Sequence, residues 1–328
     1  MVDIRTIKEY VGADWTAVAE RISSSLQSDI SLLNSTNASI LSHSGKQLRP
    51  LLAVLFARAC TSGVISEATV RYAASAELLH NATLLHDDVA DDSDQRRGVP
   101  TIRSLMGASV SVLVGDYWLV KAMELILGGA DSDTRVIQIF SKTLSDLAEG
   151  EMLQLQKAQS GDTDRADYLR IIYNKTASLF EAACVSAAVS VGASAEYEKA
   201  ARDYASALGI TFQIKDDILD YSGTESVGKP LGVDILEQKI TMPLLGAIEN
   251  ASDDMQARIR SLVKDIVSHP EYRDEIVGFV RENKGIECAS EVLNGYVEMA
   301  VRALDPLPDS FEKECLKNLA YFTGNRQV

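Results

Sequence analysis

Two groups of three aspartates, far apart in the sequence, each lie at the end of an apolar helical stretch. The first aspartate triplet (Asp87, Asp88 and Asp91) follows residues 72–85, and the second (Asp216, Asp217 and Asp220) closes residues 204–219. On a helix, the outer two aspartates of each triplet lie one turn apart on one face. Like charges at this spacing repel each other by about a few tenths of a kcal/mol. One triplet alone is typical of a solvated helix end, but two copies indicate a divalent-metal site.

The rest of the sequence predicts one helix after another. Apolar residues recur at helical spacing, whereas alternating β patterns are scarce, and 7 prolines and 20 glycines are few for 328 residues. The expected helices cover residues 14–33, 51–60, 66–91, 109–127, 133–155, 165–191 and 196–219. A polar segment at 34–42, loops at 93–100 and 222–234, and Pro243 in the first turn of a further helix complete the pattern. We expect one all-α domain over residues 1–328, a large helical bundle whose core can hold metal and ligand.

Charge and cysteine content limit the function. The net charge of −15 argues against nucleic acid as a partner. The N-terminus lacks the apolar core of a signal peptide, and no uncharged apolar run reaches the ~18 residues of a membrane span. The cysteines, at 60, 184, 288 and 315, are far apart and show no metal-ligand spacing. Reduced thiols in a cytoplasmic protein are therefore expected.

Cationic side chains lie near the aspartate triplets in the sequence. They are Lys46, Arg49, Arg96, Arg97, Lys175, Lys215, Lys229 and Lys239. Mg²⁺ prefers oxygen ligands and is typically held by one or two carboxylates plus substrate phosphates, so six aspartates could hold about two or three ions. Arg and Lys both bind phosphate. The pattern predicts a metal-bound diphosphate ligand, with the metals acting as Lewis acids on a diphosphate leaving group.

Further motifs accompany the triplets in a fixed order. Arg96-Arg97-Gly98 follows the first, Phe212-Gln213 precedes the second, and Lys229 and Asp234 follow it. The others are Gly45-Lys46-Gln47-Leu48-Arg49-Pro50, Gly115-Asp116, Glu149-Gly150-Glu151, Lys175-Thr176, Lys239-x-Thr241-x-Pro243 and Gly324-Asn325-Arg326. With these motifs the sequence resembles the trans-isoprenyl diphosphate synthases, specifically the long-chain polyprenyl type (octaprenyl- and heptaprenyl-like). One departure is Gln238, where that family is expected to have Gly.

The resemblance implies a fold, a reaction and a set of residue roles. The fold is the isoprenoid synthase bundle with a central cavity, and the reaction ionises an allylic diphosphate, to which isopentenyl diphosphate adds. All six aspartates would bind Mg²⁺. The allylic diphosphate would be contacted by Arg96, Lys175, Thr176, Gln213, Lys229 and Lys239, and the isopentenyl diphosphate by Lys46, Arg49, His80 and Arg97. The departing diphosphate would remove the proton. The resemblance also suggests a homodimer, with the apolar helix at 109–127 as its interface.

Several of these residues have a plainer interpretation. On an apolar helix His80 also fits a buried, hydrogen-bonded histidine, and His86 is interpreted as structural. Lys46 and Arg49 could be surface charges without the resemblance, and Lys215 and Asp92 solvated neighbours. Tyr117 and Trp118 are expected in the core.

Small residues one turn before Asp87 bear on product length. Ala82 and Thr83 occupy these positions, with Leu79 deeper, where a short-chain enzyme would be expected to place an aromatic side chain. Each added isoprene unit gains up to ~4 kcal/mol on burial, at ~0.8 kcal/mol per CH₂. Elongation should continue to a deeper stop, for which Ile139, Phe140 and Leu144 are candidates. We expect a product longer than about C20, roughly C30 to C40 by analogy, from a farnesyl or geranylgeranyl primer, as for a quinone side chain. A long hydrophobic product also suggests release at a membrane surface.

Rival functions fit the sequence less well. A short-chain synthase, making products of about C15 to C20, is the nearest alternative. A metal-dependent phosphohydrolase built on His86-Asp87 lacks a convincing set of further histidines. An EF-hand beginning at Asp92 fails, because its fifth and sixth positions are Arg96 and Arg97 instead of an oxygen ligand and Gly. A terpene cyclase usually mixes Asn, Ser and Glu in its second motif, and a non-catalytic partner subunit would not keep both triplets intact.

Overall fold

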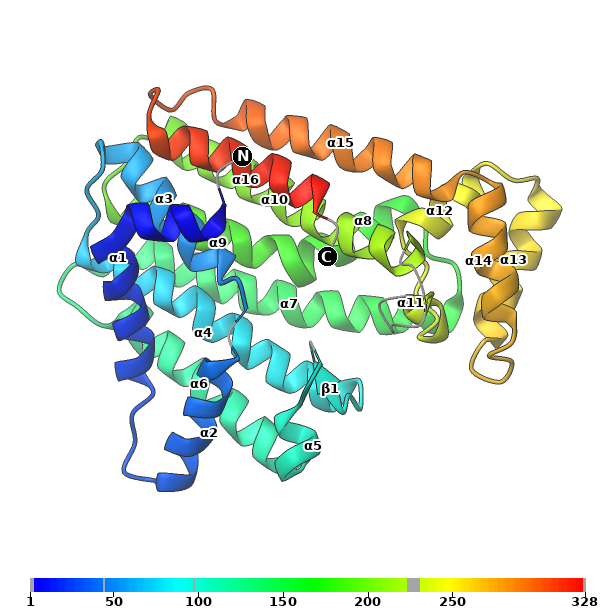
Figure 1. The fold of residues 1–328 in the computed structure, drawn as a ribbon, viewed down its shortest axis with the longest axis horizontal. Coiled ribbons are helices and arrows are strands. Elements are labelled where there is room, and N and C mark those ends of the chain that lie inside the picture. The colour runs from blue at the N-terminus through cyan, green and yellow to red at the C-terminus, as the bar shows by residue number, and fades with distance from the viewer. Residues whose placement is uncertain (1–2, 44, 97, 223–230, 327–328) are drawn as a thin grey trace. The chain divides into compact units, whose positions relative to one another are not determined.

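The computed structural model describes residues 3–43, 45–96, 98–222 and 231–326 (Figure 1). Regular structure within these ranges is helical apart from a two-stranded antiparallel hairpin, so the all-α prediction is confirmed. Tertiary contacts divide the chain into two compact units, each assembled from separate stretches. Unit 1 comprises Met1–Phe140, Ala182–Arg202 and Pro306–Leu316, and unit 2 comprises Ser141–Glu181, Asp203–Asp305 and Lys317–Val328. That residues 1–328 form a single domain remains a prediction.

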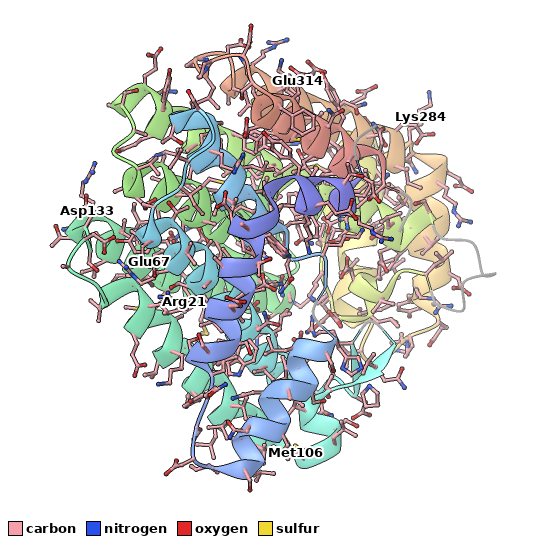
Figure 2. The ribbon with its side chains drawn as sticks, turned by 60° about the vertical axis from the view of Figure 1, so that its left-hand side comes forward. Arg21, Glu67, Met106, Asp133, Lys284 and Glu314 are labelled. Carbon is pink, nitrogen blue, oxygen red and sulfur yellow. The ribbon has the colours of Figure 1, made fainter. Side chains whose placement is uncertain are left out.

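Unit 1 contains the first aspartate triplet. Its complete elements are α1 (Ile4–Ser25), α2 (Ser31–Ser42), α3 (Leu48–Thr61), α4 (Glu67–Ala90), β1 (Gln95–Arg96), β2 (Val99–Pro100), α5 (Ile102–Met106) and α6 (Ala108–Leu127). Helix α4 is buried on every side from Ala68 to Leu79, a stretch that includes the charged residues Arg71 and Glu77. It begins at a Ser66–Thr69 capping box and is tied to α1 by the Arg21–Glu67 ion pair at 2.5 Å (Figure 2).

Unit 2 contains the second aspartate triplet. Its complete elements are α8 (Arg165–Ile172), the π-helix η1 (Tyr173–Ala177), α11 (Val233–Leu236), α12 (Met242–Glu249), α13 (Asp253–Asp265), α14 (Tyr272–Glu282) and α15 (Gly285–Ala303). Helices that contribute to both units are α7 (Thr134–Ser160), α9 (Ser178–Ser190), α10 (Ala195–Ser222) and α16 (Phe311–Asn325). The core of unit 2 gathers Ile214 and Ile218 of α10 with apolar residues of α12 to α15. These buried residues fix the C-terminal half of α10, which carries the triplet.

The expected helix over residues 14–33 is wrong at its end. Helix α1 stops at Ser25, and α2 begins only at Ser31. The side chain of Asn34 accepts from Ser28 N at 3.0 Å and donates to Ser28 O at 2.6 Å, so it satisfies backbone groups that a continuous helix would have used. The polar segment at 34–42 is helical because Asn37 is buried, donating to Leu26 O and accepting from Trp118 Nε1 at 2.8 Å.

Other elements differ from the sequence prediction only locally. The loop expected at 93–100 contains the β1–β2 hairpin, in which Arg96 pairs with Val99. The helix expected at 165–191 is interrupted by η1, and the loop at 222–234 lies mostly outside the described residues, with Val233 and Asp234 already in α11. Pro243 lies in the first turn of α12 as expected. No helix in the described part of the chain has both the length and the apolar character to cross a membrane. All four cysteines are free thiols, as expected.

Candidate active site

The first aspartate triplet lies at the C-terminal end of α4. Asp87 is half-buried, and Asp91, which caps the helix, is exposed. Asp88 is 5% exposed and accepts from Arg96 Nε at 2.7 Å. Negative charge at a helix C-terminus opposes the helix macrodipole. The hairpin that follows α4 therefore supplies one cation by bringing Arg96 back to Asp88, and Asp87 and Asp91 present oxygens suited to a divalent cation.

A close approach of α6 to α4 supports this end of the helix. A Cβ at Gly115 would lie 2.4 Å from His86 Nε2, so a larger residue there would displace the His86 ring. The same nitrogen lies 3.2 Å from Asp116 Oδ1, which explains the Gly115-Asp116 pair in structural terms. Trp118 is fully buried, which confirms its expected place in the core.

The second aspartate triplet lies in the last turns of α10. Asp216 Oδ1 accepts from Arg326 Nη2 at 2.7 Å, and that guanidinium also lies 4.1 Å from the centre of the Phe212 ring. Asp220 accepts hydrogen bonds from the backbone N–H groups of Val233 and Asp234. These bonds hold the start of α11 next to the Asp220 carboxylate. These contacts leave Asp216 accessible, with 43% of its side chain exposed.

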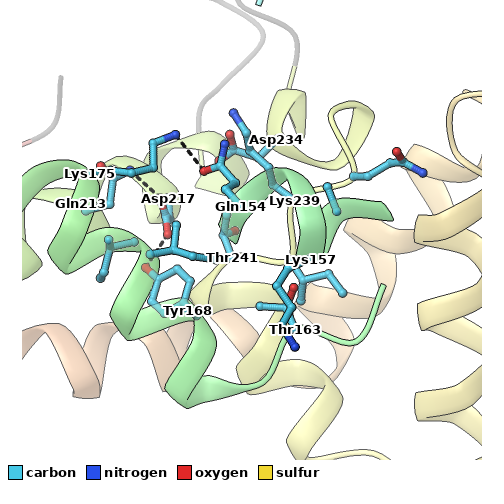
Figure 3. A pocket seen from close by; sticks show the side chains of 15 residues that line it. Gln154, Lys157, Thr163, Tyr168, Lys175, Gln213, Asp217, Asp234, Lys239 and Thr241 are labelled. Atoms are coloured by element: carbon cyan, nitrogen blue, oxygen red, sulfur yellow. Dashed lines mark hydrogen bonds between the residues drawn. The ribbon is translucent and has the colours of Figure 1, made fainter. Parts of the chain in front are cut away.

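Asp217 is held differently from its neighbours. It is 2% exposed, and its two oxygens accept from Tyr168 Oη at 2.5 Å and from Gln213 Nε2 at 3.1 Å (Figure 3). Burial, reinforced by the carboxylate of Asp234, raises the pKa of Asp217. Asp88 and Asp217 are therefore both buried and bound by protein donors, whereas Asp87, Asp91 and Asp216 are more accessible to solvent.

A cavity of about 110 Å³ in unit 2 adjoins this triplet (Figure 3). Its polar lining includes Lys175, Gln213, Asp217, Lys239 and Thr241. Lys175 Nζ lies 2.6 Å from Glu151 Oε1 and 2.9 Å from Gln154 Oε1. The cavity thus combines ammonium groups and amide donors, the groups that bind phosphate oxygens.

The π-helix η1 presents Lys175 and Thr176 to this region. Single π-turns inside helices frequently occur at functional sites. Two glycines allow η1 to approach its neighbours: a Cβ at Gly150 of α7 would lie 2.9 Å from Lys175 Cγ, and a Cβ at Gly209 of α10 would lie 2.5 Å from Ala177 Cα. In this position Thr176 Oγ1 donates to Gln213 Oε1 at 3.0 Å.

The segment after α11 explains the one departure from the family pattern. Gln238 has φ 58°, the left-handed conformation in which glycine is favoured. Its side chain donates to Lys264 O at 2.7 Å. The next residue, Lys239, pairs with Glu237 and lines the cavity. The expected Gly and the observed Gln therefore serve the same turn.

The remaining expected site residues are placed but not tested. Lys46 is exposed and Arg49 half-buried at the start of α3, and His80 is half-buried on α4. Arg97 and Lys229 lie outside the described residues. Of the chain-length candidates, Ala82 and Phe140 are buried, and Thr83 is half-buried and donates to His80 O at 2.8 Å.

Each unit offers donors that fit a hard divalent cation. Asp87 and Asp91 in unit 1, and Asp216 in unit 2, have accessible carboxylate oxygens, the ligands that Mg²⁺ prefers. In the described ranges, no three acidic, His or Cys side chains converge closely enough to enclose a metal by themselves.

Sequence reasoning missed two residues that the structure brings to this site. Tyr168 binds Asp217, and Gln154 binds Lys175. Neither belongs to a motif that the sequence analysis identified. A tyrosine in an apolar stretch looks like any core aromatic, so only the fold reveals its carboxylate partner.

Comparisons with known proteins agree with this geometry. The family model described as polyprenyl synthetase matches residues 30–279. The octaprenyl diphosphate synthase of Haemophilus influenzae is 36% identical over 99% of this chain and 98% of its own length. A crystal structure of a decaprenyl diphosphate synthase from Rhodobacter capsulatus is 34% identical, with a TM-score of 0.92 over 99% of this chain and 100% of that one. A polyprenyl synthase from Caulobacter crescentus CB15, complexed with calcium and isoprenyl diphosphate, is 32% identical, with a TM-score of 0.90 over 99% and 98% of the two chains. The chain therefore belongs to the polyprenyl synthetase family of trans-isoprenyl diphosphate synthases.

Proposed function

We propose that this protein is a Mg²⁺-dependent prenyltransferase that condenses an allylic diphosphate with successive isopentenyl diphosphates. The observation that carries the proposal is the second aspartate triplet beside a cavity lined by Lys175 and Lys239. Farnesyl or geranylgeranyl diphosphate is the proposed primer. An all-trans product of about C30 to C40, used for a quinone side chain, is proposed by analogy with the relatives. The relatives named above are octaprenyl and decaprenyl synthases, which favours this product over a short-chain one.

The chain's own side chains hold the allylic diphosphate in place. Lys175 and Lys239 already face carboxylates, and in the proposed complex their ammonium groups turn to phosphate oxygens. Gln213 donates to the same group, and Thr176 is proposed to lie in contact with it. Arg96 and Lys229, of which Lys229 lies outside the described residues, are proposed to add further contacts. When bound, two or three Mg²⁺ ions would supply Lewis-acid stabilisation of the departing diphosphate, worth roughly several kcal/mol.

Isopentenyl diphosphate is assigned to a second group of cations on the strength of the resemblance. Lys46, Arg49, His80 and Arg97 are the proposed contacts. The departing diphosphate removes the proton, so this proposal needs no protein base. The buried Ala82 and the neighbouring Thr83 leave small side chains before the first triplet, and Phe140 is the proposed stop for the growing chain.

A product assay tests the function directly. Purified protein with farnesyl diphosphate, labelled isopentenyl diphosphate and Mg²⁺ should yield prenyl chains longer than about C20, and excess chelator should abolish them. Asp91→Asn should lower the rate by about 100-fold or more, the scale of losing one preorganised charge contact. Asp92→Asn is the matched control: Asp92 is exposed, pairs with Arg103, and should tolerate the change. Equal activity with chelator, or equal losses in the two variants, would contradict the proposal.

Helix α6 is the proposed homodimer interface. Leu113, Val120 and Leu127 repeat every seven residues along one stripe and are each more than half exposed. An apolar stripe of this kind is typical of a helix that packs against a partner. Leu113→Lys should convert a dimer to a monomer in light scattering, whereas an unchanged mass for this variant would exclude this face. The proposed compartment is the cytoplasm, in keeping with the free cysteines, with contact to a membrane surface for product release.

A further inference from the structure

Tyr168 connects the core of unit 2 to the second aspartate triplet. It is 3% exposed, lies in α8 five residues before η1, and donates to Asp217 Oδ2 at 2.5 Å. At 2.5 Å this hydrogen bond lies at the short end of the range for O–H···O hydrogen bonds.

The hydrogen bond from Tyr168 is the first of a series that reaches the diphosphate-binding groups. The other oxygen of Asp217 accepts from Gln213 Nε2 at 3.1 Å, and Gln213 Oε1 accepts from Thr176 Oγ1 at 3.0 Å. The Gln213 amide has one N–H on Asp217, and its carbonyl faces Thr176. Its orientation is thereby fixed, and the second N–H of the amide remains available for a ligand.

Asp217 can orient the Gln213 amide only if the Asp217 carboxyl group is itself held in place. At 2% exposure its carboxylate depends on protein donors in place of water, and Tyr168 and Gln213 supply one donor to each oxygen. Without the Tyr168 hydroxyl, one buried oxygen loses its donor and the carboxylate is free to turn. Gln213 would then lose its fixed acceptor.

We propose that Tyr168 is a positioning residue for the allylic diphosphate: its hydroxyl fixes Asp217, which in turn orients the Gln213 amide toward the phosphate oxygens. This inference rests on the proposed function. It assigns no chemistry to Tyr168 itself, which acts through Asp217 and Gln213.

The test compares Tyr168→Phe with the wild type in two assays. Steady-state kinetics should show a rise of about tenfold to a hundredfold in KM for farnesyl diphosphate, the range found when a supporting hydrogen bond behind a ligand is lost. The KM for isopentenyl diphosphate should stay unchanged. Calorimetry with inorganic pyrophosphate and Mg²⁺ should show weaker binding by a similar factor, independently of turnover.

Tyr173→Phe is the matched control. The Tyr173 hydroxyl donates to Glu181 Oε2 at 2.8 Å, a bond of the same kind in the same unit, but Tyr173 is not among the described residues lining the cavity. This variant should leave both KM values unchanged. A merely structural role for Tyr168 would instead lower the melting temperature and change the two KM values together, and that result would overturn the inference.

A double-mutant cycle with Gln213→Ala tests whether Tyr168 acts through Gln213. If Tyr168 acts through Gln213, Tyr168→Phe should add little to the loss already caused by Gln213→Ala. Additive losses would overturn the inference. A Tyr168→Phe variant that fails to fold would show a structural role for the hydroxyl and would likewise overturn the inference. A wild type that makes no prenyl chains refutes the proposed function instead, whereas an active wild type with an unaltered Tyr168→Phe refutes only the role of Tyr168.

Discussion

Gly209→Ala adds one methyl group at the closest contact between α10 and η1. A Cβ at this position would lie 2.5 Å from Ala177 Cα and 2.7 Å from its Cβ. Both neighbours are close to the backbone, so no flexible side chain can move aside. We expect the two segments to separate instead. This separation should lengthen the Thr176–Gln213 hydrogen bond, because Thr176 precedes Ala177 and Gln213 lies one turn after Gly209.

The size of the effect follows from this contact. Ordinary contacts begin near 3.4 Å, so the segments must move apart by about 1 Å, and a misplacement of this size can cost about a hundredfold in rate. Overpacking costs about 1–3 kcal/mol, and the better helix propensity of alanine returns about 1 kcal/mol. Stability should therefore fall by at most about 2 kcal/mol while activity falls much further.

Thermal melts and prenyltransferase kinetics on the same preparations separate these effects. Gly295→Ala is the matched control, because Gly295 lies within α15 and an added Cβ meets nothing within 4 Å. This control should gain about 0.5–1 kcal/mol and keep full activity. The reasoning is refuted if Gly209→Ala melts as the control does, or if it keeps the wild-type kcat/KM for farnesyl diphosphate.

Three further substitutions probe the site. Ala82→Phe fills a buried position one turn before the first triplet, so chromatography should show products shorter by at least one isoprene unit, and an unchanged length would reject the assignment. Arg326→Gln removes the cation that pairs with the Asp216 carboxylate, an ion pair worth up to about 1 kcal/mol. Calorimetry should therefore show Mg²⁺ binding up to about fivefold tighter, and weaker binding would contradict competition between Arg326 and Mg²⁺ for Asp216. Gln238→Gly relieves a left-handed backbone and should melt no lower than the wild type, whereas Gln238→Val should lose about 1 kcal/mol or more.

The fold was predictable where local chemistry and packing agree. Helix α4 has a capping Ser66 at its start and the aspartates at its end, and the expected limits of 66–91 lie within one residue of the observed helix. The helical state of the polar segment at 34–42 was not predictable, because it depends on Asn37 reaching Trp118, a residue far along the chain. The π-turn at η1 likewise depends on its close approach to the α7 and α10 backbones.

The part of the site that could be predicted from the sequence is the clustered charge of the aspartate triplets. Aspartate triplets on apolar helices are costly without a cation, and this made them visible in the sequence. The supporting residues carry no such cost. In the sequence, Tyr168 looks like an ordinary core tyrosine, although its hydroxyl binds Asp217. Asp216 and Asp217 are adjacent in the sequence, and only the structure distinguishes them: the Asp216 side chain is 43% exposed, whereas Asp217 is 2% exposed.

An acidic protein that binds diphosphates must solve an electrostatic problem, and the cations of unit 2 indicate how. Three of the described cations near the second triplet already face carboxylates: Lys175 with Glu151, Lys239 with Glu237, and Arg326 with Asp216. These cations are therefore largely neutralised before any substrate arrives, and the net charge of −15 repels an anion further. We therefore expect metal ions to supply much of the positive charge that admits a diphosphate. Inorganic pyrophosphate should bind at least about tenfold more weakly without Mg²⁺ in calorimetry, the effect of roughly 1.4 kcal/mol. Equal binding without the metal would show that the lysines suffice on their own.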